Sequence, residues 1–357
     1  MAIETPAIDQ DKLMAFIGQV VGELGATVNA GLIVIGDRLG LYRGLAGAGL
    51  TSAGELADRT GTTERYVREW LNAQAAGGYV EYDPVSDRYS LTAEKALALA
   101  DESSPAFVGG AFQLALGSLK ATPEIESAFK SGAGYGWHEH DEGVHIGCER
   151  FFRPGYNANL VSTWLPALEG VTEKLRVGAT VADVGCGLGA STRLMAQAFP
   201  RSTFTGFDYH EGSIELARQE TDEVGLGGSI RFEVAPAAAF PGKGYDLVTM
   251  FDCLHDMGNP VGAARHVREA LASDGTWMIV EPLAGDTVQD NLNPLGRAYY
   301  AFSNFLCTPS SLSQEVGLAL GAQAGEARIR DVVKAAGFTR FRRAADSLMN
   351  AVYEARP

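Results

Sequence analysis

The twelve residues VADVGCGLGAST, at positions 181–192, constrain the fold of this chain more than any other stretch. An apolar, β-branched run precedes the glycines at 185, 187 and 189, and STRLMAQAF then follows with the pattern of a helix. Glycines let the backbone approach a ligand closely, and the amide groups at a helix N-terminus are free to bind it. The stretch therefore predicts a strand, a tight turn and a helix that together hold a cofactor.

The residues around this turn bear on which cofactor it holds. Gly185, Gly187 and Ala190 fit the permissive form of the dinucleotide fingerprint, so the glycines alone leave a nicotinamide cofactor open. Asp183 lies two residues before the first glycine, where it can accept from an ammonium group, which S-adenosylmethionine carries and a dinucleotide pyrophosphate lacks. Asp208, at the end of the next apolar run FTGFD, can bind both hydroxyls of a ribose in either cofactor. The balance favours S-adenosylmethionine.

Residues 171–357 resemble class I S-adenosylmethionine-dependent methyltransferases. The resemblance rests on the D-x-G-x-G-x-G pattern that begins at Asp183, on Asp208, on YDLVTMFDCLHDM and GTWMIVEP, and on a C-terminal segment that reads as a helix end followed by two strands. It implies an α/β fold, a Rossmann-like sheet of seven strands with helices on both faces, preceded by an α-helical winged-helix domain. The cofactor is expected at the carboxyl ends of the strands.

The resemblance also implies roles for individual residues. Asp183 and the glycines would hold the methionine part of the cofactor, and Asp208 the ribose. Ala235 and Pro236 stand where many relatives have Gly-Asp, so the acid that commonly meets adenine is missing, and Phe251 is the residue that can pack on the ring. The predicted cofactor-binding set is Asp183, Gly185, Cys186, Gly187, Gly189, Asp208, Tyr209 and Phe251.

The predicted catalytic residues follow two later strands. His255, in CLHDM, matches the general-base histidine of O-methyltransferases, and Glu281, in VEP, matches the carboxylate that orients it. An imidazole titrates near pH 6.5, which suits the removal of a hydroxyl proton at neutral pH. Asp256 is a second residue able to orient the histidine, although Asp256 and Asp252 can equally cap the following helix GAARHVREAL.

The N-terminal part has the pattern of a winged helix. Residues 10–46 read as one or two helices that are apolar over much of their surface, a pattern typical of buried helices. Residues 51–95 then read as two capped helices and a hairpin. This segment has five basic residues, Arg59, Arg65, Arg68, Arg88 and Lys95, against eight acidic ones, whereas a DNA-binding surface is normally basic. The charge balance favours a dimerisation module over a DNA-binding one.

The order of a winged helix before a methyltransferase domain resembles small-molecule O-methyltransferases, in which the N-terminal module dimerises and helps to cover the substrate. FFRPGY, FDCLHDMGNP and LCTPSSLSQEVGLALGAQAGEAR resemble an actinobacterial, especially mycobacterial, branch that is also described as transcriptional regulators. The leading prediction is a homodimer that methylates an oxygen of a hydrophobic small molecule. The alternatives are a cofactor-sensing regulator that binds DNA and a nicotinamide oxidoreductase.

These patterns predict a division of the chain into three parts: a winged-helix dimerisation domain over 1–100, a helical linker and pocket region over 101–170, and the cofactor domain over 171–357. Within the last part, an insertion at about 284–326 carries aromatic residues that can cover an apolar substrate pocket or fill a core or dimer interface, namely Tyr299, Tyr300, Phe302 and Phe305.

No metal site is predicted. His138, His140 and His145 lie close together in sequence, but no second ligand pair accompanies them, so polar loop residues or the rim of a pocket are the preferred interpretation. The four cysteines are scattered without paired spacing, which indicates reduced thiols in or near a core.

Overall composition is that of an ordinary globular protein. The chain has 357 residues, 46% of them hydrophobic, with a formal net charge of −15, so long-range repulsion of nucleic acid is expected. The start MAIETPAIDQDK lacks the pattern of a signal peptide, and no stretch has eighteen uncharged apolar residues in a row. A cytoplasmic location without membrane attachment is expected.

Overall fold

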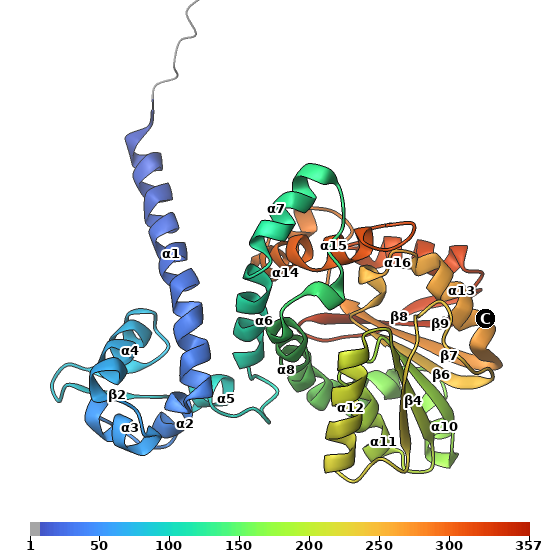
Figure 1. The fold of residues 1–357 in the computed structure, drawn as a ribbon, viewed down its shortest axis with the longest axis horizontal. Coiled ribbons are helices and arrows are strands. Elements are labelled where there is room, and N and C mark those ends of the chain that lie inside the picture. Colours follow the sequence, from blue (N-terminus) through green and yellow to red (C-terminus); the bar gives the residue numbers. More distant parts are fainter. Residues whose placement is uncertain (1–7) are drawn as a thin grey trace, which may run out of the picture. The chain divides into compact units, whose positions relative to one another are not determined.

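The computed structural model describes residues 8–357, which form two compact units, one up to Phe112 and one from Gln113 to Pro357 (Figure 1). The division falls inside one helix, α6 (Gly109–Leu119). Residues 1–7, part of the stretch expected to lack a signal peptide, lie outside the described residues. The boundaries predicted at residues 100 and 170 stay predictions.

The first unit has the helix, helix, hairpin order predicted for a winged helix. Ser52 caps α3 in a reciprocal capping box with Glu55, and two short strands pair antiparallel around the wing. Tyr42 donates to Gln74 Oε1 at 2.7 Å inside its core. The elements are α1 (Gln10–Arg38), α2 (Leu41–Leu45), α3 (Ala53–Thr60), α4 (Glu64–Ala76), β1 (Glu81–Asp83), β2 (Arg88–Ser90) and α5 (Ala93–Leu99).

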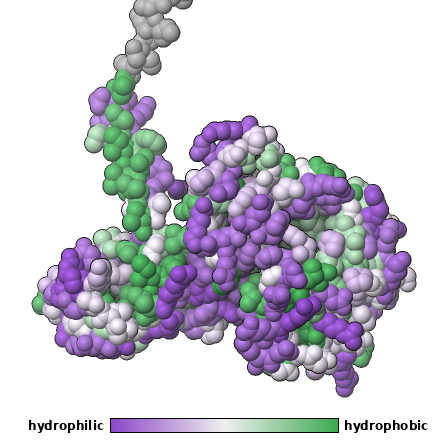
Figure 2. Space-filling model, viewed as in Figure 1, coloured by the Kyte–Doolittle hydropathy of each residue, from purple (hydrophilic) through white to green (hydrophobic). Residues whose placement is uncertain are grey.

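Helix α1 packs into its unit only near its C-terminal end, where Ile33 and Val34 are buried. Figure 2 shows apolar surface along the rest of the helix. The exposed apolar side chains are Leu13, Met14, Phe16, Ile17, Val20, Val21, Leu24 and Val28. The core of the unit meets only the C-terminal end of α1, so burial of the exposed part of the helix stays a prediction. Among residues 8–357, α1 is the one helix long and apolar enough to cross a membrane, by length and composition alone.

The second unit is a sheet with helices on both faces. Its strands are β3 (Thr180–Val184), β4 (Thr203–Asp208), β5 (Ile230–Val234), β6 (Tyr245–Phe251), β7 (Leu271–Pro282), β8 (Arg340–Asp346) and β9 (Asn350–Arg356). Its helices after α6 are α7 (Thr122–Ser131), η1 (Trp137–Glu139), α8 (Glu142–Asn159), the π-helical η2 (Leu160–Trp164), α9 (Leu165–Ala167), α10 (Val171–Val177), α11 (Ala190–Ala198), α12 (Glu211–Glu223), η3 (Leu254–Asp256), α13 (Pro260–Ala270), η4 (Gln289–Asn291), α14 (Pro294–Phe305), α15 (Cys307–Leu312) and α16 (Gly325–Ala335).

The seven strands lie in the order β5-β4-β3-β6-β7-β9-β8. Neighbours from β5 to β7 pair parallel, whereas β9 pairs antiparallel with both β7 and β8. The strand order changes direction at β3, so the turns after β3 and β6 open a crevice at the carboxyl edge of the sheet. The predicted fold class, including the two C-terminal strands, is confirmed.

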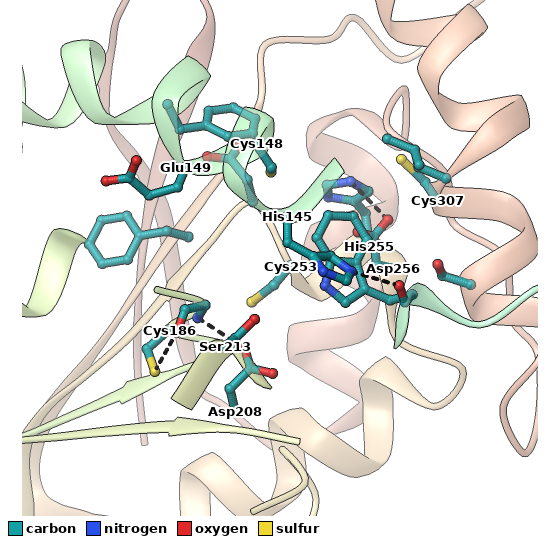
Figure 3. A pocket seen from close by; sticks show the side chains of 18 of the residues that line it. His145, Cys148, Glu149, Cys186, Asp208, Ser213, Cys253, His255, Asp256 and Cys307 are labelled. Carbon is teal, nitrogen blue, oxygen red and sulfur yellow. Dashed lines mark hydrogen bonds and ion pairs between the residues drawn. The ribbon is translucent and has the colours of Figure 1, made fainter. Parts of the chain in front are cut away.

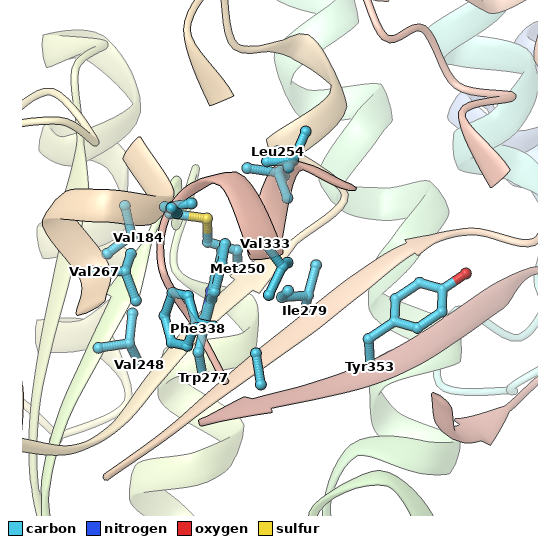
Figure 4. Packing of buried hydrophobic residues seen from close by; sticks show 14 of the residues in the cluster. Val184, Val248, Met250, Leu254, Val267, Trp277, Ile279, Val333, Phe338 and Tyr353 are labelled. Atoms are coloured by element: carbon cyan, nitrogen blue, oxygen red, sulfur yellow. The ribbon is translucent and has the colours of Figure 1, made fainter. Parts of the chain in front are cut away.

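Both faces of the sheet are buried, because alternate residues of the central strands belong to different cores. Val248 and Trp277 pack with Val267 of α13 and Val333 of α16 in the cluster of Figure 4. Leu247, the neighbour of Val248, belongs instead to the cluster that α8, η2, α10 and α11 cover. Each large apolar side chain buried in this way stabilises the fold by about 1.5 to 3 kcal/mol. The sheet is thus a rigid support for the side chains at its edge.

Candidate functional site

The glycine turn joins β3 to α11 in a shape that only glycine adopts easily. Gly185, Gly187 and Gly189 have φ angles of 73°, 54° and 79°. A Cβ atom on Gly185 would lie 2.6 Å from the sulfur of Cys253, and one on Gly189 would lie 2.5 Å from the Phe232 ring. The sequence therefore needs glycine here both for backbone conformation and for close packing. Gly185 and Gly187 line a cavity, while Gly189 does not.

Asp183 lies behind the turn rather than in the cavity lining. The residue is 1% exposed, and its carboxylate accepts from three hydroxyl groups, Ser191 Oγ at 2.7 Å, Thr192 Oγ1 at 2.6 Å and Thr249 Oγ1 at 2.9 Å. Burial raises the pKa of Asp183, and the three hydroxyl groups partly offset this. In this structure the carboxylate joins the end of β3 to α11 and β6, and its predicted contact with the cofactor stays a prediction.

Asp208 ends β4 beside the glycine turn and lines the same cavity. Its two oxygens accept from the Gly187 amide and from the His210 amide, both at 2.9 Å. Burial raises the pKa of Asp208 and these amides lower it. Each carboxylate oxygen has more than one lone pair, so Asp208 can still accept from a ligand. Tyr209, 44% exposed, follows at the rim of the cavity.

A cavity of about 480 Å³ connects this turn with the predicted catalytic residues. Figure 3 shows Cys186 and Asp208 on one side of it and His255 and Asp256 on the other. Phe251 also lines the cavity, as do Ala235 and Pro236 at the position where the acid for adenine is missing. Of the eight predicted cofactor-binding residues, the cavity lining holds Gly185, Cys186, Gly187, Asp208, Tyr209 and Phe251.

His255 lies in η3, after β6, and is held between two carboxylates. Its Nδ1 is 2.5 Å from Glu281 Oε2, and its Nε2 is 3.2 Å from Asp256 Oδ1. Glu281 belongs to β7 and also accepts from the Leu254 amide at 3.0 Å. Parallel pairing of β6 with β7 therefore brings the predicted base and its predicted orienting residue together. Burial lowers the pKa of His255, but the charges of Asp256 and Glu281 outweigh it and raise the pKa well above 6.5.

The alternative that Asp252 or Asp256 caps α13 is wrong. Asn259 occupies the N-cap position and accepts from the Gly262 amide at 2.8 Å. Asp252 instead has a φ of 50°, a strained conformation of the kind that clusters at functional sites. Its carboxylate accepts from Tyr156 Oη at 3.1 Å and from Asn350 Nδ2 at 2.7 Å. This contact of α8 and β9 with the residue that follows β6 was not predicted, because the three residues are far apart in sequence.

Aromatic and thiol groups form much of the remaining cavity wall. Tyr299 and Phe302 of α14 line the cavity and also pack in the neighbouring core, as the pocket and core interpretations each predict. Phe305 packs in that core without lining the cavity, and Tyr300 does not line the cavity. The cavity lining also holds all four cysteines of the chain, Cys148, Cys186, Cys253 and Cys307. Spacing along the chain carries no signal for this convergence, which depends on the packing of four separate elements.

The three histidines of the linker separate in the structure. His138 and His145 line the cavity, in line with the pocket-rim interpretation. His140 is 6% exposed, and neither of its ring nitrogens has a hydrogen-bond partner. Burial lowers the pKa of His140 to about 4, so the ring is neutral at pH 7. Within residues 8–357, none of these histidines belongs to a group with the geometry of a metal site.

Two segments of the chain match known protein families. Residues 27–101 match the Rv2258c-like winged HTH domain, and residues 182–277 match the methyltransferase domain. The chain joins a winged-helix domain to a methyltransferase domain. The methyltransferase domain includes the glycine turn, Asp208 and His255.

Individual relatives agree with these domain matches. A ubiquinone biosynthesis O-methyltransferase of Bordetella avium is 32% identical over 38% of this chain and 54% of its own length. A trans-aconitate 2-methyltransferase of Streptomyces avermitilis is 31% identical over 32% of this chain and 43% of its own length. The chain thus covers about half the length of these relatives.

The fold of the chain also resembles a solved structure over its full length. Human N-acetylserotonin methyltransferase in complex with SAM superposes with a TM-score of 0.71, covering 100% of this chain and 99% of that one at 16% identity. At this identity the likeness concerns the fold. It covers the winged-helix domain as well as the methyltransferase domain.

Proposed function

We propose that this protein transfers a methyl group from S-adenosylmethionine to an oxygen atom of a hydrophobic small molecule. The observation that carries the proposal is that one cavity joins the glycine turn and Asp208 to an imidazole oriented by a buried carboxylate. The first pair of features suits a nucleoside cofactor and the second suits an acceptor with a proton to lose. Both are needed for methyl transfer to a hydroxyl group.

The residues present fit S-adenosylmethionine. The turn exposes backbone at Gly187, where an added Cβ would meet no atom within 4 Å, so a ligand can approach closely. Asp208 offers oxygens to the ribose, and Phe251 offers an apolar ring surface in place of the missing adenine acid. When bound, this cofactor would supply a methyl group on a positively charged sulfonium. The leaving group is then a neutral thioether, which needs no further activation.

His255 is proposed to accept the proton of the acceptor hydroxyl at Nε2. Glu281 fixes the ring through Nδ1 and stabilises the positive charge that the ring gains. Asp256 lies against Nε2, so it stabilises the same charged form. The base must be neutral before it can accept a proton. Each carboxylate therefore has two opposing effects on catalysis: it holds the ring in place, but it also favours the protonated form of the ring.

The walls of the cavity support a largely apolar acceptor. Phe151, Phe152 and Tyr156 of α8 face the cavity together with Tyr299 and Phe302 of α14. Aromatic side chains stabilise a flat, apolar ligand through contact area and ring stacking. We therefore infer an acceptor with a hydroxyl group on an apolar, aromatic frame.

The proposal is tested by replacing the base. His255→Ala should leave S-adenosylmethionine affinity unchanged in a calorimeter and lower turnover of a phenolic acceptor by about 100-fold or more. His266→Ala is the matched control, since His266 lies in α13 and bonds to the Phe240 carbonyl rather than lining the cavity. Unchanged turnover in His255→Ala would place the base elsewhere, and S-adenosylmethionine that fails to bind the wild type would remove the function itself.

We also propose that α1 pairs with a second copy of the chain. Its exposed apolar side chains recur at three- and four-residue spacing, for example Leu13, Ile17, Val20 and Leu24, which is the pattern of a helix that packs on another helix. Gln19 and Glu23 bond to each other on the same helix, so it also carries polar positions. A stripe of this kind fits a protein partner better than a helix surrounded by lipid.

DNA binding by the winged helix is not part of the proposal. Four of its five basic side chains pair with acids: Arg65 with Glu69, Arg68 with Glu64, Arg88 with Glu55 and Lys95 with Glu81. The fifth, Arg59, donates to the Gly44 carbonyl and to Thr51. Phosphate contacts would have to compete with these pairs. We further propose a cytoplasmic location, with α1 serving the dimer.

A further inference from the structure

Three side chains on the catalytic side of the cavity bring together a nitrogen, an oxygen and a sulfur. They are His255 and Asp256 of η3 and Cys307, the first residue of α15. One ligating atom of each lies within 4.8 Å of the other two, and all three residues line the cavity. Figure 3 shows them on the side away from Cys186 and Asp208.

The spacing of these atoms is close to that of a metal coordination shell. In a tetrahedral site with bonds of about 2.0 to 2.3 Å, neighbouring ligand atoms lie roughly 3.3 to 3.7 Å apart. His255 Nε2 and Asp256 Oδ1 are already 3.2 Å apart. The Cys307 sulfur lies within 4.8 Å, so a small rotation of one side chain brings it into range.

The surroundings of His255 match those of a metal ligand. Metal-bound histidines typically donate their other ring nitrogen to a carboxylate, which fixes the ring and directs the free lone pair at the ion. Glu281 holds Nδ1 at 2.5 Å in this way and leaves Nε2 facing Asp256. Asp256 Oδ1 is buried and makes no well-aligned hydrogen bond, and its ion-pair neighbour is His255 Nε2 at 3.2 Å, so a cation placed between the two atoms would satisfy both.

The donor set selects a class of ion. One imidazole, one carboxylate and one thiolate suit a borderline or soft divalent cation such as Zn²⁺ and its analogue Co²⁺, whereas Mg²⁺ and Ca²⁺ prefer oxygen ligands alone. The carboxylate and the thiolate together balance the charge of a divalent ion. Binding would displace the proton of the Cys307 thiol and leave His255 neutral.

We propose that His255 Nε2, Asp256 Oδ1 and Cys307 Sγ form a binding site for one zinc-class divalent cation, with its fourth coordination position open to the cavity. The ion occupies the lone pair of Nε2 that the proposed methyl transfer uses to accept a proton. The metal-bound protein is therefore inactive, and removal of the ion restores turnover. The binding site itself does not depend on the proposed function, whereas the inhibition rests on it.

Cobalt binding to the full-length, chelator-treated protein tests the site directly. Titration with Co²⁺ should saturate at one equivalent and produce a near-ultraviolet absorption band from thiolate-to-cobalt charge transfer. Cys307→Ala should abolish the band, and Cys148→Ala should retain it, because Cys148 lines the same cavity outside the group of three. A wild-type protein without the band, or a Cys307→Ala variant that keeps it, overturns the proposal.

Zinc inhibition is measured separately against each protein's own metal-free turnover. Zn²⁺ should inhibit the wild type, and a chelator should reverse the inhibition. Cys307→Ala should need at least about ten-fold more Zn²⁺ for the same degree of inhibition, since one ligand is gone. If Co²⁺ binds as expected and Zn²⁺ leaves turnover unchanged, the proposed inhibition and the role of His255 as base are both overturned. If Co²⁺ binds but no acceptor is methylated even without metal, the proposed function fails and the cation site stands.

Discussion

His255 combines two properties that oppose each other in a general base. The carboxylates of Glu281 and Asp256 hold both ring nitrogens, which fixes the geometry that catalysis needs. The same charges raise the pKa of the ring against the opposing effect of burial, so a larger fraction of the protein carries a protonated histidine at neutral pH. At the scale of single residues, orientation and readiness to accept a proton must therefore be balanced.

This balance predicts the pH dependence of turnover. Only neutral His255 accepts a proton, so kcat, measured with a chelator present, should rise as pH rises through a raised pKa above 6.5. Asp256→Asn removes one of the two charges that raise this pKa, so its acid limb should move to lower pH. A limb that stays in place in Asp256→Asn would show that another group titrates.

Asp208 gives a second prediction at the residue scale. Because its carboxylate lines the cavity beside Gly187, Asp208→Ala should weaken S-adenosylmethionine binding by about 1.5 to 3 kcal/mol, the range for a hydrogen bond to a charged group. Calorimetry of the variant and of Glu215→Ala, an exposed carboxylate on α12, measures this. Equal loss in the two variants, or none in Asp208→Ala, would contradict the ribose-binding role.

Asp183 shows how one residue can join three elements. From the end of β3 it accepts hydrogen bonds from Ser191 and Thr192 in the first turn of α11 and from Thr249 in β6. The hydrogen bonds of Asp183 therefore anchor the turn between β3 and α11, while Gly185 and Gly187 of the same turn line the cavity. At the scale of elements, the acid of the motif supports the shape of the glycine turn.

A stability measurement separates this support from direct binding. Asp183→Ala leaves three hydroxyl groups without their acceptor, so the free energy of unfolding should fall by about 2 to 4 kcal/mol. Ser191→Ala removes one donor and keeps the carboxylate, so its loss should be about 1 kcal/mol. Denaturant unfolding of both variants tests this, and a fully stable Asp183→Ala protein would show that the hydroxyl contacts contribute little.

The whole molecule carries an exposed apolar helix on the unit that lacks the cavity. Burying such a stripe against a second copy removes apolar surface from water, at about 25 cal/mol per Å². The exposed side chains of α1 therefore provide the driving force for the proposed dimer. The first unit has its own core, formed by residues such as Leu56 and Leu71, so changes on the exposed part of α1 should leave it folded.

Charge substitution on α1 tests the dimer. Ile17→Glu combined with Leu24→Glu should convert a dimer to a monomer in light scattering after size-exclusion chromatography, because two charges would be buried in the interface. Glu23→Lys on the same helix serves as the control for a change of charge. A wild-type monomer, or association of the wild type with lipid vesicles through α1, would contradict the dimer.

Local sequence determined the parts of the site that lie within one short segment or at the ends of paired strands. The strand, turn and helix around Gly185 follow from glycine spacing, and Asp208 follows from its place at the end of the next strand. The pairing of His255 with Glu281 is implied by the resemblance to O-methyltransferases, and the structure places Nδ1 and Oε2 2.5 Å apart. In each case, the chain's local pattern and the parallel sheet together set the geometry.

The tertiary structure alone decided which distant side chains meet. Cys148 and Cys307 lie on different helices yet line one cavity, and Tyr156 bonds to Asp252 across 96 positions of sequence. The hydroxyl partners of Asp183 and the exposure of α1 were likewise decided by the tertiary structure. Periodicity reports which face of an element is apolar, but not which other element covers it. That depends on packing between segments, whose contacts leave no pattern in either segment taken alone.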